Sequence, residues 1–445
     1  MRLALNAFEE YMFLDDSSSY PMNCYLVMSF TGTVDKERFE QSVRAALATK
    51  HPLALCRVVK TKNDHYYWEK FFDNITIDWY ANSTVSGSNF RGKAFEPFSE
   101  PLFRLHIFTS ENKFEIVLEL HHSLSDAAGV FSFLNDVFKL YASSDDIEDN
   151  TEAPDEIIEQ LRNRNSFGLS VYESLRRFTD YLCYLPRAWT FLFRYPISIV
   201  AYDSKLADSP LPEKFPVCIT RILDADQTNW LKQSARENGI SINDIALAAV
   251  FRAIEKFRNE QGIPSSKKKF RIAVPTDLRR PTDKLSSISN RVSMVFIDRA
   301  ASQINDSEKL LNTIHKEMRH IKKHSLGWAF IFGLGIYKKV FGNFRGMSRQ
   351  KRCWSSAVVT NLQQIFKNQN NGKLKIQSGK DPNKTAVLET IETYPPIRPW
   401  TTISIGIYTY ANQFYISASY DSRVITETQA NQFFEICVEE LKAFL

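Results

Sequence analysis

Two histidines and an aspartate lie close together in the sequence, at His121, His122 and Asp126. A neutral imidazole has one acceptor and one donor nitrogen, so a histidine beside a bound hydroxyl or amine can take its proton as that group attacks a carbonyl. Positioned general-base catalysis of this kind contributes about 10²–10⁴-fold to a rate. No serine or cysteine nucleophile is required, because the acceptor itself attacks. His122 is therefore the candidate base.

Asp126 follows His122 by four residues, and its carboxylate could fold back toward the histidines or bind a distant arginine. Structural alternatives stand beside this interpretation. A histidine that ends a strand is often half-buried without a catalytic role, and Asp126 or Ser125 could simply cap the next helix. Paired histidines can also bind a metal, but no cysteine and no third histidine lies at ligand spacing nearby.

The residues on either side predict the elements that position this group. Before it, apolar and acidic residues alternate with the period of a half-buried strand over residues 114–120. After it, apolar residues recur at helical spacing, at Val130, Leu134, Val137, Phe138 and Tyr141. The histidines and the aspartate thus occupy a short loop between a buried strand and a buried helix, where functional residues are often placed.

The segment HHSLSDAAG, residues 121–129, resembles the HHxxxDG motif of a large acyltransferase superfamily. That superfamily holds chloramphenicol acetyltransferases, condensation domains of peptide synthetases, and O-acyltransferases that make wax, polyketide or alcohol esters. The likeness extends along the chain, with similar segments at residues 21–53, 239–254, 289–293 and 357–362 and in the closing strands and helix. It is nearest to the freestanding O-acyltransferases. The motif departs from the pattern at Ala127, where glycine is usual, with Gly129 two places later.

The resemblance implies an α/β fold of two chloramphenicol-acetyltransferase-like lobes. Each lobe would be a mixed sheet flanked by helices, with the active-site tunnel between them. Prolines 210, 212 and 216 form a joint, so we expect an N-terminal lobe over residues 1–205 that carries the motif and a C-terminal lobe over residues 215–445. A chain of 445 residues is long enough for two cores.

The resemblance also assigns roles to individual residues. Arg279, in the segment Pro275–Pro281, is expected to pair with Asp126 and join the lobes, with Arg280 as its rival. Either the Thr360 hydroxyl or the Asn361 amide is expected to donate to the oxyanion, unless Asn361 merely closes a strand.

Two further residues take supporting roles in the same scheme. His121 would pack beneath the tunnel without touching the acceptor, and Gly129 would support the site, since glycine permits close backbone approach.

The implied reaction transfers an acyl group from a thioester to an alcohol, with His122 as general base and no covalent acyl-enzyme. The thioester, acyl-CoA or acyl-phosphopantetheine, is a co-substrate, and we expect neither a bound cofactor nor a metal. The acceptor would be a small alcohol or a lipid, and an acyl carrier protein is an open partner. Two alternatives remain: an amide-forming condensation enzyme, and a non-catalytic relative that binds a carrier or an acyl ligand.

Composition limits the other classes of function. The chain has 44% hydrophobic and 24% charged residues, and its net charge of +5 is too small to indicate nucleic-acid binding. Six scattered cysteines without a CxxC pair predict a reduced, cytoplasmic protein, and the N-terminus does not resemble a signal peptide. We expect a monomer. His320 and His324, four residues apart, are read as a solvated helix end rather than a zinc pair.

Some segments bear on membrane contact or predict irregular structure. Residues 181–200 are long enough to span a bilayer, but two arginines and two prolines interrupt them, and a central arginine costs about 2.5–3.5 kcal/mol. Core packing, an interfacial helix or a wall of an acyl channel remain open for them. Residues 326–354, rich in glycine, aromatics and bases, could meet an acidic ligand or a membrane surface. Residues 143–159 predict a solvated linker and residues 363–382 a loop.

Overall fold

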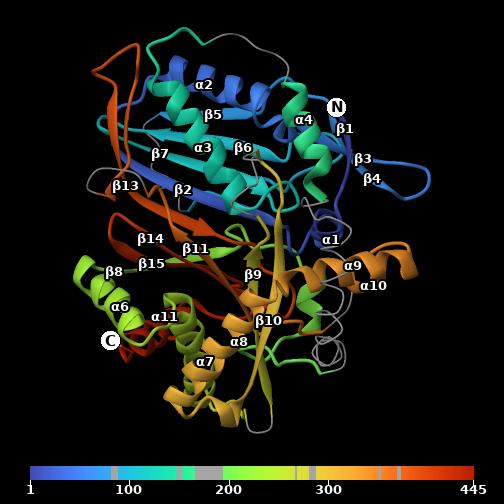
Figure 1. Cartoon of the computed structure of the whole chain (residues 1–445), viewed down its shortest axis with the longest axis vertical. Coiled ribbons are helices and arrows are strands. Elements are labelled where there is room, and N and C mark those ends of the chain that lie inside the picture. Colours follow the sequence, from blue (N-terminus) through green and yellow to red (C-terminus); the bar gives the residue numbers. More distant parts are fainter. Residues whose placement is uncertain are drawn as a thin grey trace.

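Two six-stranded mixed sheets, each covered by helices, form two lobes that lie one above the other (Figure 1). The structure, a computed structural model, describes residues 1–81, 89–147, 153–165, 194–265, 268–279, 287–348, 352–367 and 372–444. We call the lobe that contains the histidine pair the N lobe and the other the C lobe. This arrangement confirms the predicted α/β fold of two lobes.

The N-lobe sheet has the strand order β12-β13-β2-β7-β6-β5. Its strands are β12 (Lys375–Gln377), β13 (Thr385–Tyr394), β2 (Asn23–Gly32), β7 (Lys113–His121), β6 (Phe103–Thr109) and β5 (Thr76–Ala81). Helices α2 (Lys36–Thr49) and α3 (Ala127–Ala142) lie together across the sheet (Figure 1). Their buried faces, which include Phe39, Val43, Phe133 and Val137, form one core with the strands. The apolar residues that recur at strand and helix spacing thus face the core, as predicted.

The C-lobe sheet has the strand order β10-β9-β11-β14-β15-β8. Its strands are β10 (Val292–Ala300), β9 (Lys269–Asp277), β11 (Ala357–Gln364), β14 (Ile403–Tyr410), β15 (Gln413–Tyr420) and β8 (Val217–Leu223). It packs with helices α6 (Ala225–Glu237), α7 (Ile242–Glu260), α8 (Ser307–Lys323) and α11 (Glu427–Lys442). A capping box opens α7, with reciprocal bonds between Ser241 and Asp244.

A crossover joins the two lobes. Strands β12 and β13 follow most of the C-lobe strands in sequence, yet β13 pairs antiparallel with β2 at the edge of the N-lobe sheet. The expected division into lobes over residues 1–205 and 215–445 assigns β12 and β13 to the C lobe, whereas both strands belong to the N-lobe sheet. The C-terminal half of the chain therefore contributes to both sheets.

The remaining elements pack at the side of the molecule and around the joint between the lobes. They are β1 (Arg2–Ala4), α1 (Ala7–Asp15), η1 (Pro52–Leu55), β3 (Cys56–Lys60), β4 (Tyr66–Lys70), α4 (Asp155–Arg162), η3 (Asn163–Asn165), η4 (Ser204–Asp208), η5 (Ala301–Gln303), α9 (Gly327–Phe341) and α10 (Arg345–Ser348). Strands β1, β4 and β3 form a small third sheet. Helices α1 and α9 come from opposite halves of the chain and share an apolar cluster.

Two segments that the sequence predicts as irregular contain regular structure. The predicted linker 143–159 includes the first turns of α4, because Leu161 is buried and Arg164 just beyond the helix forms a buried ion pair with Glu9. The predicted loop 363–382 contains β12, which extends the N-lobe sheet by pairing with β13. In both cases tertiary contacts outweigh a polar local composition.

No helix in the described part of the chain is long and apolar enough to cross a membrane. Of the segment 181–200, residues 181–193 lie outside the described residues. The choice between core packing, an interfacial helix and a channel wall therefore stays open for that segment.

Candidate active site

The histidine pair ends a central strand at the joint between the lobes. Strand β7 ends at His121, and α3 begins after its N-cap residue Asp126, so the predicted loop is short. The backbone amide of His122 donates to the Met22 carbonyl oxygen at 2.7 Å, which fixes the loop to the segment before β2. A rigid strand and a capped helix thus hold the histidine at both ends.

His122 presents a free nitrogen on an oriented ring. Its Nδ1 lies 3.1 Å from the Ser125 carbonyl oxygen and donates to it, so Nε2 carries the lone pair. The side chain is partly exposed, and Nε2 has no hydrogen-bond partner among the described residues. Desolvation lowers the pKa of His122 below its ordinary value of 6.5, against the opposing effects of the Ser125 carbonyl and Asp126. The ring is therefore a neutral base at neutral pH.

His121 has the opposite tautomer and a different environment. Its Nδ1 accepts from the Ser123 backbone amide at 3.2 Å and lies 2.7 Å from the Ser123 hydroxyl, so the proton is on Nε2. Nε2 faces Asp16 at 3.4 Å, and the side chain is fully buried. This placement agrees with the packing role expected for His121.

Asp126 joins the lobes through Arg279. The guanidinium binds both carboxylate oxygens, at 2.8 and 3.0 Å, in the two-bond geometry that arginine allows. The backbone amides of Gly129 and Arg291 donate to the same carboxylate, at 3.0 and 2.7 Å. Burial opposes the charge, but Arg279 and these donors hold the pKa of Asp126 below its ordinary value. The pairing implied by the resemblance is present, and Asp126 also caps α3; the rival Arg280 lies outside the described residues.

A second clamp between the lobes involves Asn290, which sequence reasoning left without a role. Its side-chain amide donates to the carbonyl oxygens of His122 and Ser123, at 2.6 and 2.8 Å. Because both partners are carbonyls, they fix the orientation of the amide. Its Oδ1 is buried, with no hydrogen-bond partner among the residues that the structure describes. The resemblance of residues 289–293 to a segment of the family is the sequence feature that could have pointed to Asn290. The C lobe thus holds the loop of the candidate base through the backbone of that loop.

Gly129, rather than position 127, is where the motif needs glycine. A Cβ at residue 129 would lie 2.4 Å from the Ser125 hydroxyl oxygen, closer than such atoms approach, and 3.1 Å from the Ser289 backbone nitrogen, which is a tight contact. Ala127 is only partly buried, in the first turn of α3. Alanine in place of the motif glycine is therefore compatible with this loop.

Asn361 lies on β11 and already uses both ends of its side chain. Its Oδ1 accepts from the Gln363 backbone amide at 2.8 Å, and its Nδ2 lies 3.4 Å from Asn243 Oδ1. The first bond is the turn contact that we considered as an alternative. Neither contact tests whether Asn361 or Thr360 donates to an oxyanion, so that role stays a prediction.

Other histidines in the described residues have structural partners. His51 is fully buried, between Asp136 at 3.2 Å and the Ile288 backbone amide at 3.0 Å, and so adds another link between the lobes. The rings of His320 and His324 contact each other at the end of α8. No group of three or more potential metal ligands occurs among the described residues.

The architecture matches solved structures over the whole chain. The first condensation domain of the CDA synthetase superimposes with a TM-score of 0.72, with 13% identity over 100% of this chain and 96% of that one. The chain has the condensation-domain fold. A trichothecene 15-O-acetyltransferase from Fusarium sporotrichioides shares it, with a TM-score of 0.74 and 12% identity over 100% of this chain and 95% of that one. So does polyketide synthase associated protein 5 from Mycobacterium tuberculosis (TM-score 0.65, 15% identity, 98% of each chain).

Sequence relatives of this chain are distant. An uncharacterized protein of Mycobacterium tuberculosis is 24% identical over 319 residues, 69% of each chain. A phthiocerol/phthiodiolone dimycocerosyl transferase of Mycobacterium ulcerans is 27% identical over 170 residues, 37% of this chain and 38% of that one. No protein-family model matches the chain. These relatives are consistent with the resemblance that the histidine motif indicates.

Proposed function

We propose that the protein is an acyltransferase that moves an acyl group from an acyl thioester to an alcohol, with His122 as the general base. The observation that carries this proposal is the His122 ring itself. Its Nδ1 is held by the Ser125 carbonyl, its Nε2 has no partner among the described residues, and its pKa is lowered. The fold shared with an O-acetyltransferase supports it.

In this mechanism the acceptor hydroxyl donates its proton to His122 Nε2 as its oxygen attacks the thioester carbonyl carbon. The new C–O bond gives a tetrahedral oxyanion, to which Asn361 or Thr360 would donate. The intermediate collapses with cleavage of the C–S bond, and His122 returns the proton to the departing thiolate. The products are an ester and a free thiol, and no acyl-enzyme forms.

Asp126 has a structural part in this scheme. Both of its oxygens are occupied by Arg279 and by backbone amides, so it has no acceptor free for substrate. It holds the loop that carries His122, and alignment of base and acceptor supplies much of the remaining rate. Coenzyme A or a carrier-bound phosphopantetheine would carry the acyl group as co-substrate, with no other cofactor.

The experiment that tests this function is incubation of the purified protein with a panel of acyl-CoAs and mixed alcohols. Release of free thiol and formation of ester, both dependent on the alcohol, are the expected results. Product that forms only with amine acceptors would favour the amide-forming alternative. Binding of acyl thioester without release of thiol would favour a non-catalytic relative.

A further inference from the structure

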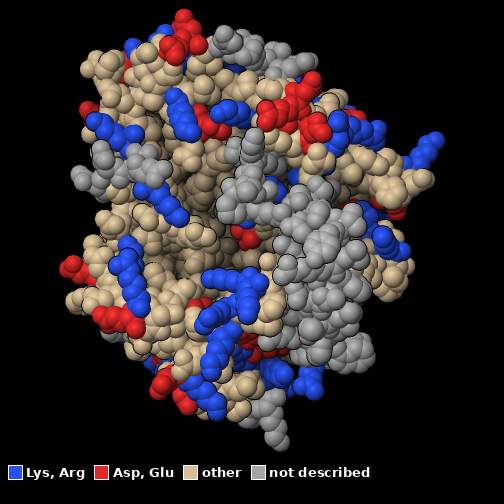
Figure 2. All heavy atoms as spheres, in the orientation of Figure 1, with Lys and Arg blue, Asp and Glu red and all other residues tan. Residues whose placement is uncertain are grey.

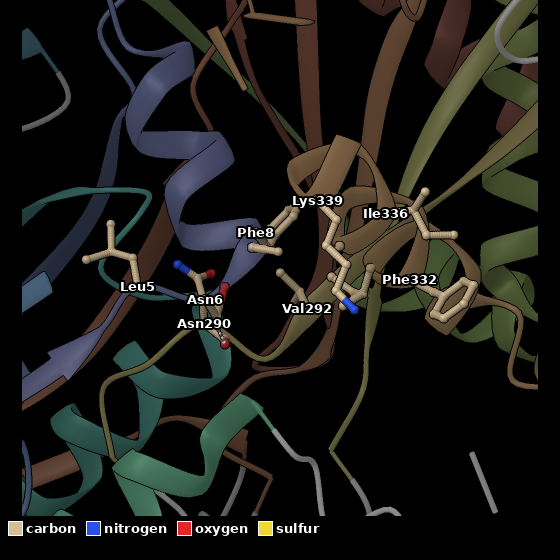
Figure 3. Close-up of a pocket in the computed structure, with 11 residues that line it drawn as sticks. Leu5, Asn6, Phe8, Asn290, Val292, Phe332, Ile336 and Lys339 are labelled. Atoms are coloured by element: carbon tan, nitrogen blue, oxygen red, sulfur yellow. Dashed lines mark hydrogen bonds between the residues drawn. The ribbon is translucent and has the colours of Figure 1, made fainter. Parts of the chain in front are cut away.

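A cavity of about 430 Å³ lies where α1, α9 and the start of β10 meet. Figure 3 shows its walls, which come from residues 5–8 and from residues 290–339. Most of its side chains are apolar: Leu5, Phe8, Val292, Ile331, Phe332 and Ile336. This volume falls within the range of small-molecule sites, and such sites are mostly apolar with a few polar groups.

The cavity is connected to the candidate base through Asn290. This residue lines the cavity, and its amide binds the carbonyl oxygens of His122 and Ser123. Asn290 is fully buried, and its Oδ1 has no hydrogen-bond partner among the described residues. Because that oxygen is itself buried, Asn290 forms a polar wall at the inner end of the cavity and not an open hydrogen-bonding group. One end of the cavity is therefore polar and adjoins the catalytic loop.

The wall formed by α9 continues toward the surface. Ile336 lines the cavity and is half-exposed, and Val340, one turn later, is largely exposed. Lys339 also lines the cavity and is exposed, with no salt bridge among the described residues. A lysine can cover apolar surface with its stem while its ammonium stays in water. The apolar surface thus runs from the buried Asn290 to an open outer end.

We propose that this cavity binds the long aliphatic chain of one of the two substrates, with the polar end of that substrate toward Asn290. The inference rests on the proposed function, which it deepens by naming a long-chain substrate. Hydrocarbon suits the lining, because each methylene moved from water to an apolar wall is favourable. The chain belongs either to the acyl donor or to the acceptor alcohol, and the tests below distinguish the two.

Two glycines of α9 provide a matched pair of variants. Gly335 lines the cavity and Gly333 does not, and a Cβ at either position would meet nothing within 4 Å. Two residues apart on a helix, they face directions about 160° apart. Gly335→Phe should therefore fill the cavity, whereas Gly333→Phe places the same side chain elsewhere on the same helix.

The first test measures binding without catalysis. The probe is cis-parinaric acid, a fluorescent fatty acid, and palmitate displaces it. Wild type and Gly333→Phe should bind with equal affinity, and Gly335→Phe should bind at least about tenfold more weakly, the loss expected from about two methylenes left in water. Equal affinity of the two variants, or no binding by wild type, would overturn the proposal. Binding in the absence of any transferase activity would reject the proposed function and leave this cavity assignment intact.

The second test identifies the source of the chain. Thiol release is compared for palmitoyl-CoA and acetyl-CoA with ethanol as acceptor, and then for hexadecanol and ethanol with acetyl-CoA as donor. Gly335→Phe should lower the long-to-short rate ratio at least about tenfold in one series, and that series names the substrate that uses the cavity. If both ratios stay at their wild-type values, the cavity does not hold a substrate chain.

Discussion

At the scale of single residues, the chemistry depends on which nitrogen of His122 is free. Nδ1 donates to the Ser125 carbonyl, so in the proposed mechanism Nε2 takes the proton of the acceptor hydroxyl. His121, one residue earlier, has its proton on the other nitrogen and is buried. His121 is the last residue of β7 and His122 opens the turn that follows, so the two neighbouring rings have different environments.

The pH dependence of the rate follows from the lowered pKa of His122. The neutral ring is the active form, so kcat/KM should fall as the pH drops through that pKa and should be level at neutral pH. We therefore expect an acid limb with its midpoint below 6.5, the ordinary value. The measurement is thiol release against pH. A midpoint above 6.5, or a rate that rises toward acid, would contradict the assigned protonation state.

The close packing at Gly129 predicts that a larger side chain there destabilises the fold. Gly129→Ala places a Cβ against Ser125 and Ser289, so we expect a loss of stability of about 1–3 kcal/mol and reduced turnover. In an unhindered helix the same change would be neutral or stabilising. The control is Ala127→Gly, at the partly buried position, with a change within about 1 kcal/mol. Denaturant unfolding measures the free energy of unfolding of both variants. An equal loss in the two would show that residue 129 is not closely packed.

At the scale of elements, the segment 287–291 of the C lobe holds the N-lobe loop that carries the candidate base. Asn290 binds two carbonyl oxygens of that loop, and the Arg291 amide binds Asp126. The Ile288 amide binds His51. The first three contacts hold the loop from His122 to Asp126, so we expect a change in this segment to move the candidate base without touching substrate.

Asn290 is therefore a positioning residue. Asn290→Ala removes the donor and leaves two carbonyls unpaired, and Asn290→Asp keeps the size but also loses the donor. Both variants should lower kcat, by up to about 10²-fold for a displacement near 1 Å, and should destabilise the fold by about 1–3 kcal/mol.

Asn238→Ala is the matched control, because Asn238 also donates to a carbonyl but is exposed at the end of α6. It should change neither kcat nor stability measurably. If Asn290→Asp keeps the wild-type kcat, the amide does not position the loop.

Local patterns predict much of the fold and the core of the site. The closing strands that the sequence indicates are β14 and β15, and their hairpin turns at Ala411 and Asn412, with φ values of 47° and 60°. Local sequence patterns do not predict the structure where contacts between distant segments determine it. Strand β13 alternates in burial but joins the sheet of the other lobe, and nothing in residues 385–394 specifies that partner. Asn290 likewise acquires its role only through contacts made across the lobes.

At the scale of the whole molecule, buried contacts hold two lobes in one arrangement. Arg398 pairs with Asp15, and the Tyr20 hydroxyl donates to Asp421 at 2.6 Å. The Asp126–Arg279 pair lies among these contacts and next to the base. The space-filling view shows a hollow between the lobes on one face (Figure 2). Substrates that enter between the lobes would meet a site built from both.

The Asp126–Arg279 pair should contribute stability that depends on pH. Arg279→Met leaves a buried carboxylate without its partner, so we expect a loss of about 3 kcal/mol near neutral pH. The folded-state pKa of Asp126 is lowered, so its contribution is present above the unfolded-state value and is lost as the pH falls through the folded-state pKa. The difference between wild type and variant should therefore shrink in acid.

Lys256→Met is the control for that comparison, because Lys256 and Glu439 form an exposed pair between α7 and α11. Its removal should cost less than about 1 kcal/mol. Urea unfolding at several pH values measures both variants. If the loss of stability in Arg279→Met is no larger than the loss in Lys256→Met, or does not depend on pH, the Asp126–Arg279 pair does not stabilise the contact between the lobes.

The most direct test of the central claim is the turnover of His122→Ala, measured as alcohol-dependent release of free thiol from acyl-CoA. We predict that it falls by about 10²–10⁴-fold while the unfolding transition is unchanged. His65→Ala, at an exposed position away from the site, should keep the wild-type rate. If His122→Ala turns over as fast as His65→Ala, His122 is not the base and the proposed mechanism is wrong.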